Sequence, residues 1–188
     1  MKKRRFSRDD WITLGLTELS TNGPEGVKLE AICNAARLTR GSFYHHFNDH
    51  ETFLLSLAER WLNSQTTQVA DNVEKDASPT DQSFALTEAA MQIDYRLELG
   101  MRELGRRAPA IGGIIKKADT IRVETLSSLY QQRYGLDATT AGELAFLEYA
   151  TFSGIILLDP DMPQDRQKSL ADLYDKTVSR SLTKKDHP

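Results

Sequence analysis

The stretch of sequence that decides the fold is residues 29–44, LEAICNAARLTRGSFY. Its first half repeats apolar residues three and four positions apart, which predicts a short amphipathic helix over residues 28–36. After a tight break, a second short helix is predicted over residues 40–47, with the hydroxyl of Thr39 placed to cap its first turn. Leu38 is the apolar residue expected to pack between the two helices. Two short helices joined in this way have the geometry of a helix-turn-helix.

The second of these helices begins with Arg40, Gly41 and Ser42. They place a cation, a bare backbone and a hydroxyl at the helix end that enters the major groove in helix-turn-helix proteins. Such groups read base edges and bind phosphates. Arg40 can offer two parallel donors to O6 and N7 of a guanine. A phosphate contact is the alternative for this side chain.

The rest of this helix is amphipathic. Phe43 and Phe47 are spaced to face the core, whereas Tyr44 and His45 fall on the outer face, within reach of a phosphate backbone. The pattern therefore favours a DNA-binding helix. The alternative is a three-helix core whose outer polar residues are incidental.

The charge of the chain is unevenly distributed. The net charge is −3, but residues 1–50 carry a balance of +2 and residues 51–188 a balance of −5. The N-terminal excess is compatible with a nucleic-acid partner, and a solvated basic tail is the alternative explanation. The basic tail consists of Lys2, Lys3, Arg4 and Arg5.

Almost every other segment also has the apolar periodicity of a helix, and the strand pattern is absent. We therefore predict an all-α protein with about nine helices, in which a small N-terminal module precedes a larger helical bundle. Ser7 is a plausible N-cap of the first helix, and the pair Gly23-Pro24 stops it. The predicted helices outside the helix-turn-helix are 7–22, 51–73, 82–104, 109–117, 120–134, 138–158 and 164–182.

The N-terminal pattern resembles the TetR family of transcriptional regulators, the tetracycline-repressor-like proteins. The resemblance covers residues 7–60 and is most specific in residues 38–47, LTRGSFYHHF. It implies a homodimer that represses by binding a palindromic operator and leaves it when a small molecule enters the C-terminal domain. It also implies a DNA-binding domain over residues 1–50 and a ligand-binding and dimerisation domain over residues 51–188. Other matching positions are Gly23, Leu29, Ile32, Ala36, Glu51, Leu54 and Leu55.

Three positions depart from the family pattern. Arg37 stands where the turn usually has glycine, so a left-handed backbone there would cost about 1 kcal/mol. Val27 stands where a phosphate-binding threonine is common, and Lys28 is expected to take over that contact. His50 replaces the usual lysine before the fourth helix and is expected to make a weaker phosphate contact. The predicted DNA-binding residues are Lys28, Thr39, Arg40, Gly41, Ser42, Tyr44, His45 and His50.

The larger bundle is expected to hold the effector and the dimer contact. Its aromatic and methionine side chains are the natural lining of a cavity and favour an apolar or aromatic effector, although core packing is the alternative for each one. The last two helices are expected to form an intermolecular four-helix bundle. The helix starting at Glu51 is expected to transmit the effect of a bound effector to the DNA-binding module. The candidate effector-binding residues are Trp61, Phe84, Met91, Tyr95, Met101, Tyr130, Tyr149 and Phe152.

Other functions find little support in the sequence. His45, His46 and His50 are clustered, but no Glu-x-x-His pair completes a metal site in a helical bundle, and no cofactor is predicted. Cys33 is expected to be a core thiol, with redox sensing as the alternative. No nucleotide-binding or serine-hydrolase motif is present, so enzyme activity is not expected. An enzyme or carrier on a helical bundle, or an adaptor with a decayed DNA module, are the rival functions.

The expected location is the cytoplasm. The charge-free stretch 149–158 is far shorter than the roughly 20 residues that span a bilayer. The basic N-terminus is not followed by the apolar run of a signal peptide. A single cysteine also fits a reducing compartment. We therefore expect no membrane segment.

Overall fold

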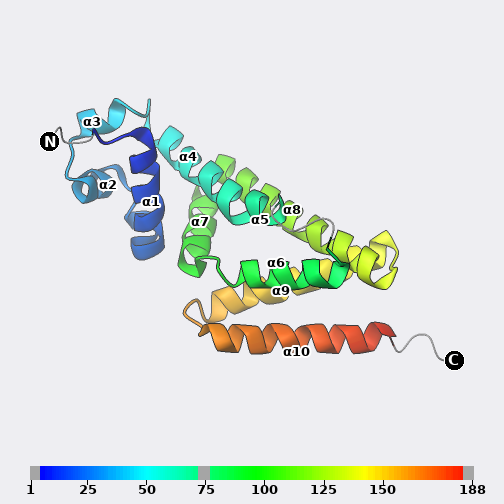
Figure 1. Cartoon of the computed structure of the whole chain (residues 1–188). Helices are drawn as coiled ribbons and strands as arrows, with labels where there is room; N and C mark the ends of the chain where they lie inside the picture. The colour runs from blue at the N-terminus through cyan, green and yellow to red at the C-terminus, as the bar shows by residue number, and fades with distance from the viewer. Residues whose placement is uncertain (1–4, 72–76, 184–188) are drawn as a thin grey trace. The chain divides into compact units, whose positions relative to one another are not determined.

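The computed structural model describes residues 5–71 and 77–183, and within these ranges it contains helices and no strand (Figure 1). Because α4, η2 and α5 follow one another without a break, the described α-helices form nine continuous segments, and the all-α prediction is confirmed. The elements are α1 (Arg8–Asn22), η1 (Gly23–Glu25), α2 (Leu29–Ala36), α3 (Arg40–Tyr44), α4 (His50–Leu62), η2 (Asn63–Thr67), α5 (Gln68–Asp71), α6 (Pro79–Ala90), α7 (Tyr95–Arg107), α8 (Pro109–Tyr134), α9 (Ala138–Leu158) and α10 (Gln164–Thr183).

In two places the chain is divided into helices differently from the sequence-based prediction. The predicted helix 82–104 is two helices, α6 and α7, because the carboxylate of Asp94 accepts a hydrogen bond from Leu97 N at 3.0 Å and starts a new helix there. The predicted helices 109–117 and 120–134 are one helix, α8. Helices usually stop at glycine or proline. Residues 118–119 contain neither, so the helix continues through them.

The helices at the start of the chain also end differently from the prediction. Helix α3 stops at Tyr44, because the chain turns at residues 45–46. Helix α4 begins at His50 with Asp49 as its cap, and then widens into the π-helical turn η2 before α5. The end of the predicted helix 51–73 lies outside the described residues.

The chain divides into two compact units. Unit 1 comprises Met1–Gln68 and Asp94–Ile121, and unit 2 comprises Val69–Ile93 and Arg122–Pro188. These units are defined by packing. The predicted boundary at residue 50 separates a DNA-binding domain from a ligand-binding domain, and it stays a prediction. In unit 1 a single apolar core is formed by residues of α1, α2, α3, α4, α7 and the first part of α8. Its largest buried side chains include Trp11, Trp61, Phe43, Phe47, Phe53 and Met101.

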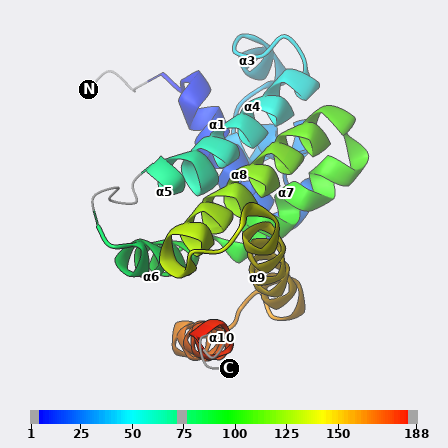
Figure 2. The same cartoon turned by 90° about the vertical axis from the view of Figure 1, so that its right-hand side faces the viewer.

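Helix α7 packs directly on α1 within unit 1 (Figures 1 and 2). Gly100 permits the close approach, because a Cβ at this position would lie 2.9 Å from the backbone oxygen of Leu19. Ser20 at the end of α1 donates a hydrogen bond of 2.6 Å to Asp94, the cap of α7. The first helix of the predicted DNA-binding module is therefore held by α7 as well as by α4.

Unit 2 has a smaller core, formed around Tyr130, Ala141 and Ala145. Polar contacts join its helices: Tyr130 of α8 donates to Glu148 of α9 at 2.7 Å. Arg133 of α8 pairs with Asp175 of α10 at 2.6 Å. The C-terminal part of α8 is thereby linked to both α9 and α10.

Helix α9 is unusually apolar. By length and composition alone it could cross a membrane, a test that core helices of other proteins also pass. The charge-free stretch 149–158 is too short to indicate a helix of that length. The helix reaches the required length because it contains only two charged residues, Glu143 and Glu148.

Candidate nucleic-acid interface

The helix-turn-helix is formed by α2 and α3, as the sequence predicts. The hydroxyl oxygen of Thr39 accepts a hydrogen bond from Ser42 N at 3.2 Å, which confirms Thr39 as the cap of α3. Phe43 is fully buried and packs edge-on against Trp11 at 5.4 Å and Phe53 at 5.2 Å between ring centroids. This aromatic contact fixes α3 against α1 and α4. The short helix is therefore held by tertiary packing rather than by its own length.

The outer face of α3 is open to solvent. Tyr44 is 48% exposed, and Arg40, Gly41 and His45 are also exposed. Phe47 is buried with Phe43, so the predicted division of this segment into an inner and an outer face is confirmed. The exposed set combines a guanidinium, a bare backbone, a phenol and an imidazole, all of which can donate hydrogen bonds to DNA.

The turn between α2 and α3 contains the left-handed residue that the sequence suggested. Arg37 has φ 54° and ψ 39°, and among the described residues it is the only non-glycine with a positive φ. Its N–H bonds to Asn34 O, and Leu38 N bonds to Cys33 O, both at 3.0 Å. These bonds satisfy carbonyls at the end of α2 in a conformation that usually requires glycine.

Lys28 lies at the start of α2 and forms an ion pair with Glu25 on the molecular surface. The hydrogen bond from Lys28 lowers the pKa of the Glu25 carboxyl. Lys28 is the N-cap of α2, and its side chain makes no capping hydrogen bond. The predicted phosphate role thus requires Lys28 to exchange Glu25 for a phosphate.

His50 is placed differently from a free surface cation. Its Nε2 lies 2.7 Å from the backbone oxygen of Val27, just before α2. One of the two ring nitrogens is therefore engaged inside the protein. The predicted phosphate contact of His50 is left to its other nitrogen.

Arg8 is a structural residue of this region that the sequence analysis missed. Its guanidinium donates to Ser56 of α4 at 2.6 Å and lies 5.1 Å from the ring centroid of Phe47. It joins the first turn of α1 to α4 and to the end of the helix-turn-helix. A second missed feature is local: Phe6, one residue before the cap Ser7, packs on Trp11 at 5.2 Å. This N′ to N4 spacing is a hydrophobic staple and was recognisable in the sequence.

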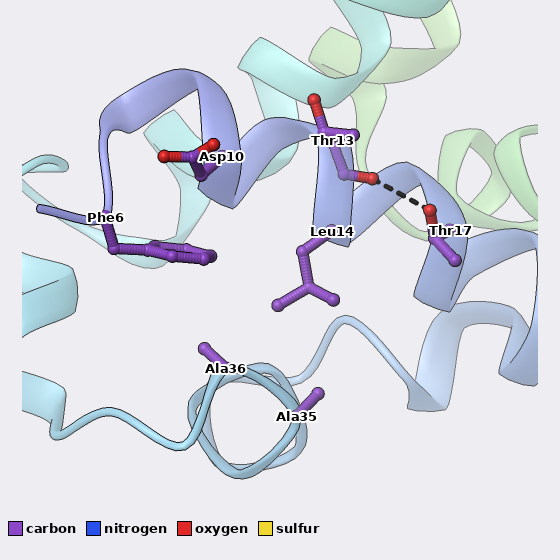
Figure 3. Close-up of a pocket in the computed structure, with 7 residues that line it drawn as sticks. All are labelled: Phe6, Asp10, Thr13, Leu14, Thr17, Ala35 and Ala36. Carbon is purple, nitrogen blue, oxygen red and sulfur yellow. Dashed lines mark hydrogen bonds between the residues drawn. The ribbon is translucent and has the colours of Figure 1, made fainter. Parts of the chain in front are cut away.

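A shallow groove of about 360 Å³ lies between α1 and α2. Figure 3 shows Phe6 and Leu14 on one side of it and the two alanines of α2 on the other. None of the eight candidate effector-binding residues lines this groove. The lining residues are Phe6, Asp10, Thr13, Leu14, Thr17, Ala35 and Ala36.

The eight candidate effector-binding residues are divided between the two units. Trp61, Tyr95 and Met101 are buried in unit 1, and the other five belong to unit 2. In unit 2 the hydroxyl of Tyr149 accepts a hydrogen bond from Arg122 at 3.0 Å. Burial raises the pKa of Tyr130. Their role in effector binding stays a prediction. The unit 2 residues are Phe84, Met91, Tyr130, Tyr149 and Phe152.

Cys33 is buried in the core of unit 1. Burial raises the pKa of its thiol, although nearby Arg40 lowers it in part. A thiol with a raised pKa is a poor nucleophile, which favours the core assignment over redox sensing. Within residues 5–71 and 77–183, no three His, Cys, Asp or Glu side chains are grouped to hold a metal ion.

Solved structures of transcriptional regulators share this fold. One from Rhodococcus sp. Rha1 has a TM-score of 0.79 and 17% identity, covering 93% of this chain and 97% of that one. One from Saccharomonospora viridis in complex with choline has a TM-score of 0.77 and 15% identity over 90% and 95%. A TetR regulator from Legionella pneumophila has a TM-score of 0.74 and 14% identity over 97% and 100%.

The helix-turn-helix region also matches a known family in its sequence. No curated protein sequence matches the chain significantly. Residues 12–57 match the family model of bacterial regulatory proteins of the tetR family. This range contains most of α1, the whole helix-turn-helix and the start of α4. Residues 12–57 thus form a helix-turn-helix DNA-binding module of the tetR family of bacterial regulatory proteins, and the chain as a whole shares the fold of solved transcriptional regulators.

Proposed function

We propose that this regulator is a homodimeric repressor that binds a palindromic operator and is released from it by a small-molecule effector. The observation that carries the proposal is the exposed polar face of α3, anchored from behind by the buried ring of Phe43. Because the helix is already anchored, its backbone need not be ordered when its side chains enter a groove, which lowers the entropic cost of binding. Such a function is exercised in the cytoplasm, where bacterial DNA lies.

In this proposal the DNA-binding residues divide into two groups. Arg40, the first residue of α3, reads a guanine through its two parallel donors. Tyr44, His45 and Lys28 bind phosphates, which position the protein without reading the sequence. Thr39 and Ser42 flank Arg40 and support either kind of contact, since a hydroxyl can both donate and accept.

The homodimer is proposed to form through α9 and α10. Several large apolar side chains on these helices are exposed, and Leu158 reaches 86% exposure. Contiguous exposed apolar side chains mark interaction surfaces, and a second copy of the chain would cover them with an identical surface in an isologous contact. This pairing also accounts for the apolar character of α9 without a membrane. The exposed residues are Phe146, Leu147, Leu157, Leu158 and Leu173.

Effector release is proposed to act through the helices that hold α1. A dimer binds two half-sites about 34 to 36 Å apart or a multiple of that distance. A ligand in the helical domain that moves α4 or α7 would carry α1 and the helix-turn-helix with it, because both helices pack on α1. A coupling of about 1 to 3 kcal/mol is typical of such linkage. The similar Saccharomonospora viridis regulator, solved with choline, supports a small-molecule site; for this chain we propose an apolar or aromatic effector.

The experiment that tests this function begins with selection of bound duplexes from a random-sequence library by the full-length protein. We expect a palindromic consensus and a band shift with two protomers per duplex. A thermal-shift screen of small metabolites and drugs then finds ligands, since binding to the native state raises its stability. Such a ligand should weaken binding of the selected duplex. Failure to select any consensus contradicts the DNA-binding proposal, and a bound ligand that leaves operator affinity unchanged contradicts the release mechanism for that ligand.

A further inference from the structure

A hydrogen bond joins the first residue of α4 to the chain immediately before α2. The atoms are Nε2 of His50 and the backbone oxygen of Val27, 2.7 Å apart and 23 residues apart in sequence. The contact is partly buried, and Val27 is only 1% exposed. A carbonyl oxygen only accepts, so Nε2 of His50 must carry the proton in this bond.

The surroundings of His50 hold its ring in this orientation. The ring centroid lies 6.4 Å from that of Phe43 and 6.1 Å from that of Phe53, at tilted interplanar angles. Both aromatic residues belong to the buried core of unit 1. His50 therefore contacts the same phenylalanine, Phe43, that anchors α3.

Apolar packing of Val27 in the core of unit 1 also holds the start of α2, but its polar restraints are few. Its cap position is Lys28, whose side chain makes no capping bond and pairs instead with Glu25 on the surface. The backbone before α2 is held locally by Lys28 N donating to Glu25 O at 3.3 Å. Val27 O is thus the backbone atom through which the N-terminus of α2 is tied to α4.

We infer that His50 is a positioning residue: its Nε2–H holds Val27 O, and so fixes the start of α2 against α4 in the conformation that binds DNA. This inference rests on the proposed DNA-binding function and replaces the phosphate contact expected of a lysine at the same position. Helix α2 packs on α3, so a displaced α2 would move both Lys28 and the recognition helix. The role belongs to the hydrogen bond and needs no positive charge.

Three substitutions separate the two roles: His50→Gln keeps an N–H donor without charge, His50→Lys keeps N–H donors together with a charge, and His50→Ala keeps neither. The first measurement needs no DNA: it is hydrogen exchange, in the full-length protein, of the backbone amides of residues 32–35, the first in α2 that donate hydrogen bonds within the helix. We expect exchange to be faster in His50→Ala by about three- to tenfold and close to wild type in His50→Gln. Glu51→Gln, at the next position of α4 and exposed, is the matched control and should not alter it.

The second measurement is affinity for the duplex selected by the wild-type protein, at several salt concentrations. We expect His50→Ala to bind about five- to tenfold more weakly, the usual effect of one lost hydrogen bond, and His50→Gln to stay within about twofold. The dependence of affinity on salt should be unchanged, whereas loss of a phosphate contact lowers the slope by about 0.9.

The outcomes distinguish this inference from the proposed function. Rescue by lysine but not by glutamine, with a lower salt slope in the alanine variant, would overturn the positioning role and restore the phosphate contact. Unchanged amide exchange in all three variants would also overturn it, even if the protein binds DNA. The third outcome is faster amide exchange in His50→Ala, near-normal exchange in His50→Gln, and no duplex selected by the protein. It would support the positioning of α2 by His50 and contradict only the proposed DNA-binding function. If His50→Ala does not fold, the comparison of glutamine with lysine decides.

Discussion

Unit 1 and unit 2 differ in the exposure of their large apolar side chains. In unit 1 the rings of Trp11, Phe43 and Trp61 are completely buried in one core. In unit 2, Phe146 is 62% exposed, and Leu147, Leu157 and Leu158 on the same helix are exposed as well. The DNA-binding module is thus complete within one chain, whereas the C-terminal helices present a surface that a second copy can cover.

The polar contacts of the two units differ as well. In unit 1, Arg8–Ser56, Ser20–Asp94 and His50–Val27 each join helices that are far apart in sequence, and they fix where α1 and α2 lie. In unit 2 the pair Tyr130–Glu148 is placed in a protected environment, where burial raises the pKa of the carboxyl. The first set restrains geometry, and the second makes stability depend on pH.

The largest expected effect is loss of the core ring of the recognition helix. Phe43→Ala should lower the free energy of unfolding by about 3 to 5 kcal/mol, because it removes a fully buried phenyl ring. Phe84→Ala in unit 2, where the ring is exposed, should change it by less than about 1 kcal/mol. Urea denaturation of both variants measures the difference. Equal losses would mean that the two units do not differ in this way.

The dimer surface provides the next largest effect. Phe146→Glu should weaken self-association by at least about 2 kcal/mol, or roughly 30-fold, because it puts a charge into a desolvated contact. Sedimentation equilibrium over a range of concentrations measures the change, and Glu143→Gln on the same helix is the control. A wild-type protein with the mass of a single protomer at micromolar concentration would exclude this interface.

Arg40→Ala tests how the exposed face of α3 reads DNA. It should lower the preference for the selected duplex over scrambled DNA by about 1 to 3 kcal/mol, because one bidentate base contact is lost. Lys28→Ala should weaken binding of both duplexes alike. It should also reduce the slope of log affinity against log salt concentration by about 0.9. Titrations of both duplexes at several salt concentrations give the two quantities. If Arg40→Ala lowers the slope and leaves the preference intact, base reading belongs to another residue.

Arg37→Gly tests the strained turn. Glycine relieves the left-handed backbone, so the free energy of unfolding should rise by up to about 1 kcal/mol. Thermal and urea unfolding measure it, with Arg40→Gly, at the first position of α3, as the control that should not stabilise. A loss of stability in Arg37→Gly would show that the side chain of Arg37 contributes more than the strain costs.

The smallest expected effect is a change with pH in unit 2. Burial raises the pKa of Glu148 above its ordinary value of 4.5, an effect that Asp175 reinforces and that Tyr130 and Arg133 oppose. The folded state then binds the proton more tightly, so the stability from this group is full below the ordinary value and falls as pH rises through the raised pKa. Glu148→Gln should remove that slope. Parallel slopes for the wild type and the variant, in urea denaturation across this range, would contradict the assignment.

Local patterns in the sequence determined the helix-turn-helix. Thr39 caps α3, Ser7 caps α1, and Phe43 and Phe47 face the core, as their spacing predicts. Capping and helical periodicity involve residues within a few positions of one another, so the sequence alone displays them. The exposed face of α3 follows from the same periodicity. The left-handed turn at Arg37 was anticipated through the family resemblance.

Contacts between distant residues could not be predicted in this way. The approach of Gly100 to Leu19 and the bond from His50 to Val27 depend on how separate helices pack. The same holds for the division of the candidate effector-binding residues between two units. A periodic pattern marks which face of a helix is buried, but it does not name the partner, because many partners satisfy the same apolar face. Tertiary packing alone decided that His50 turns toward the protein.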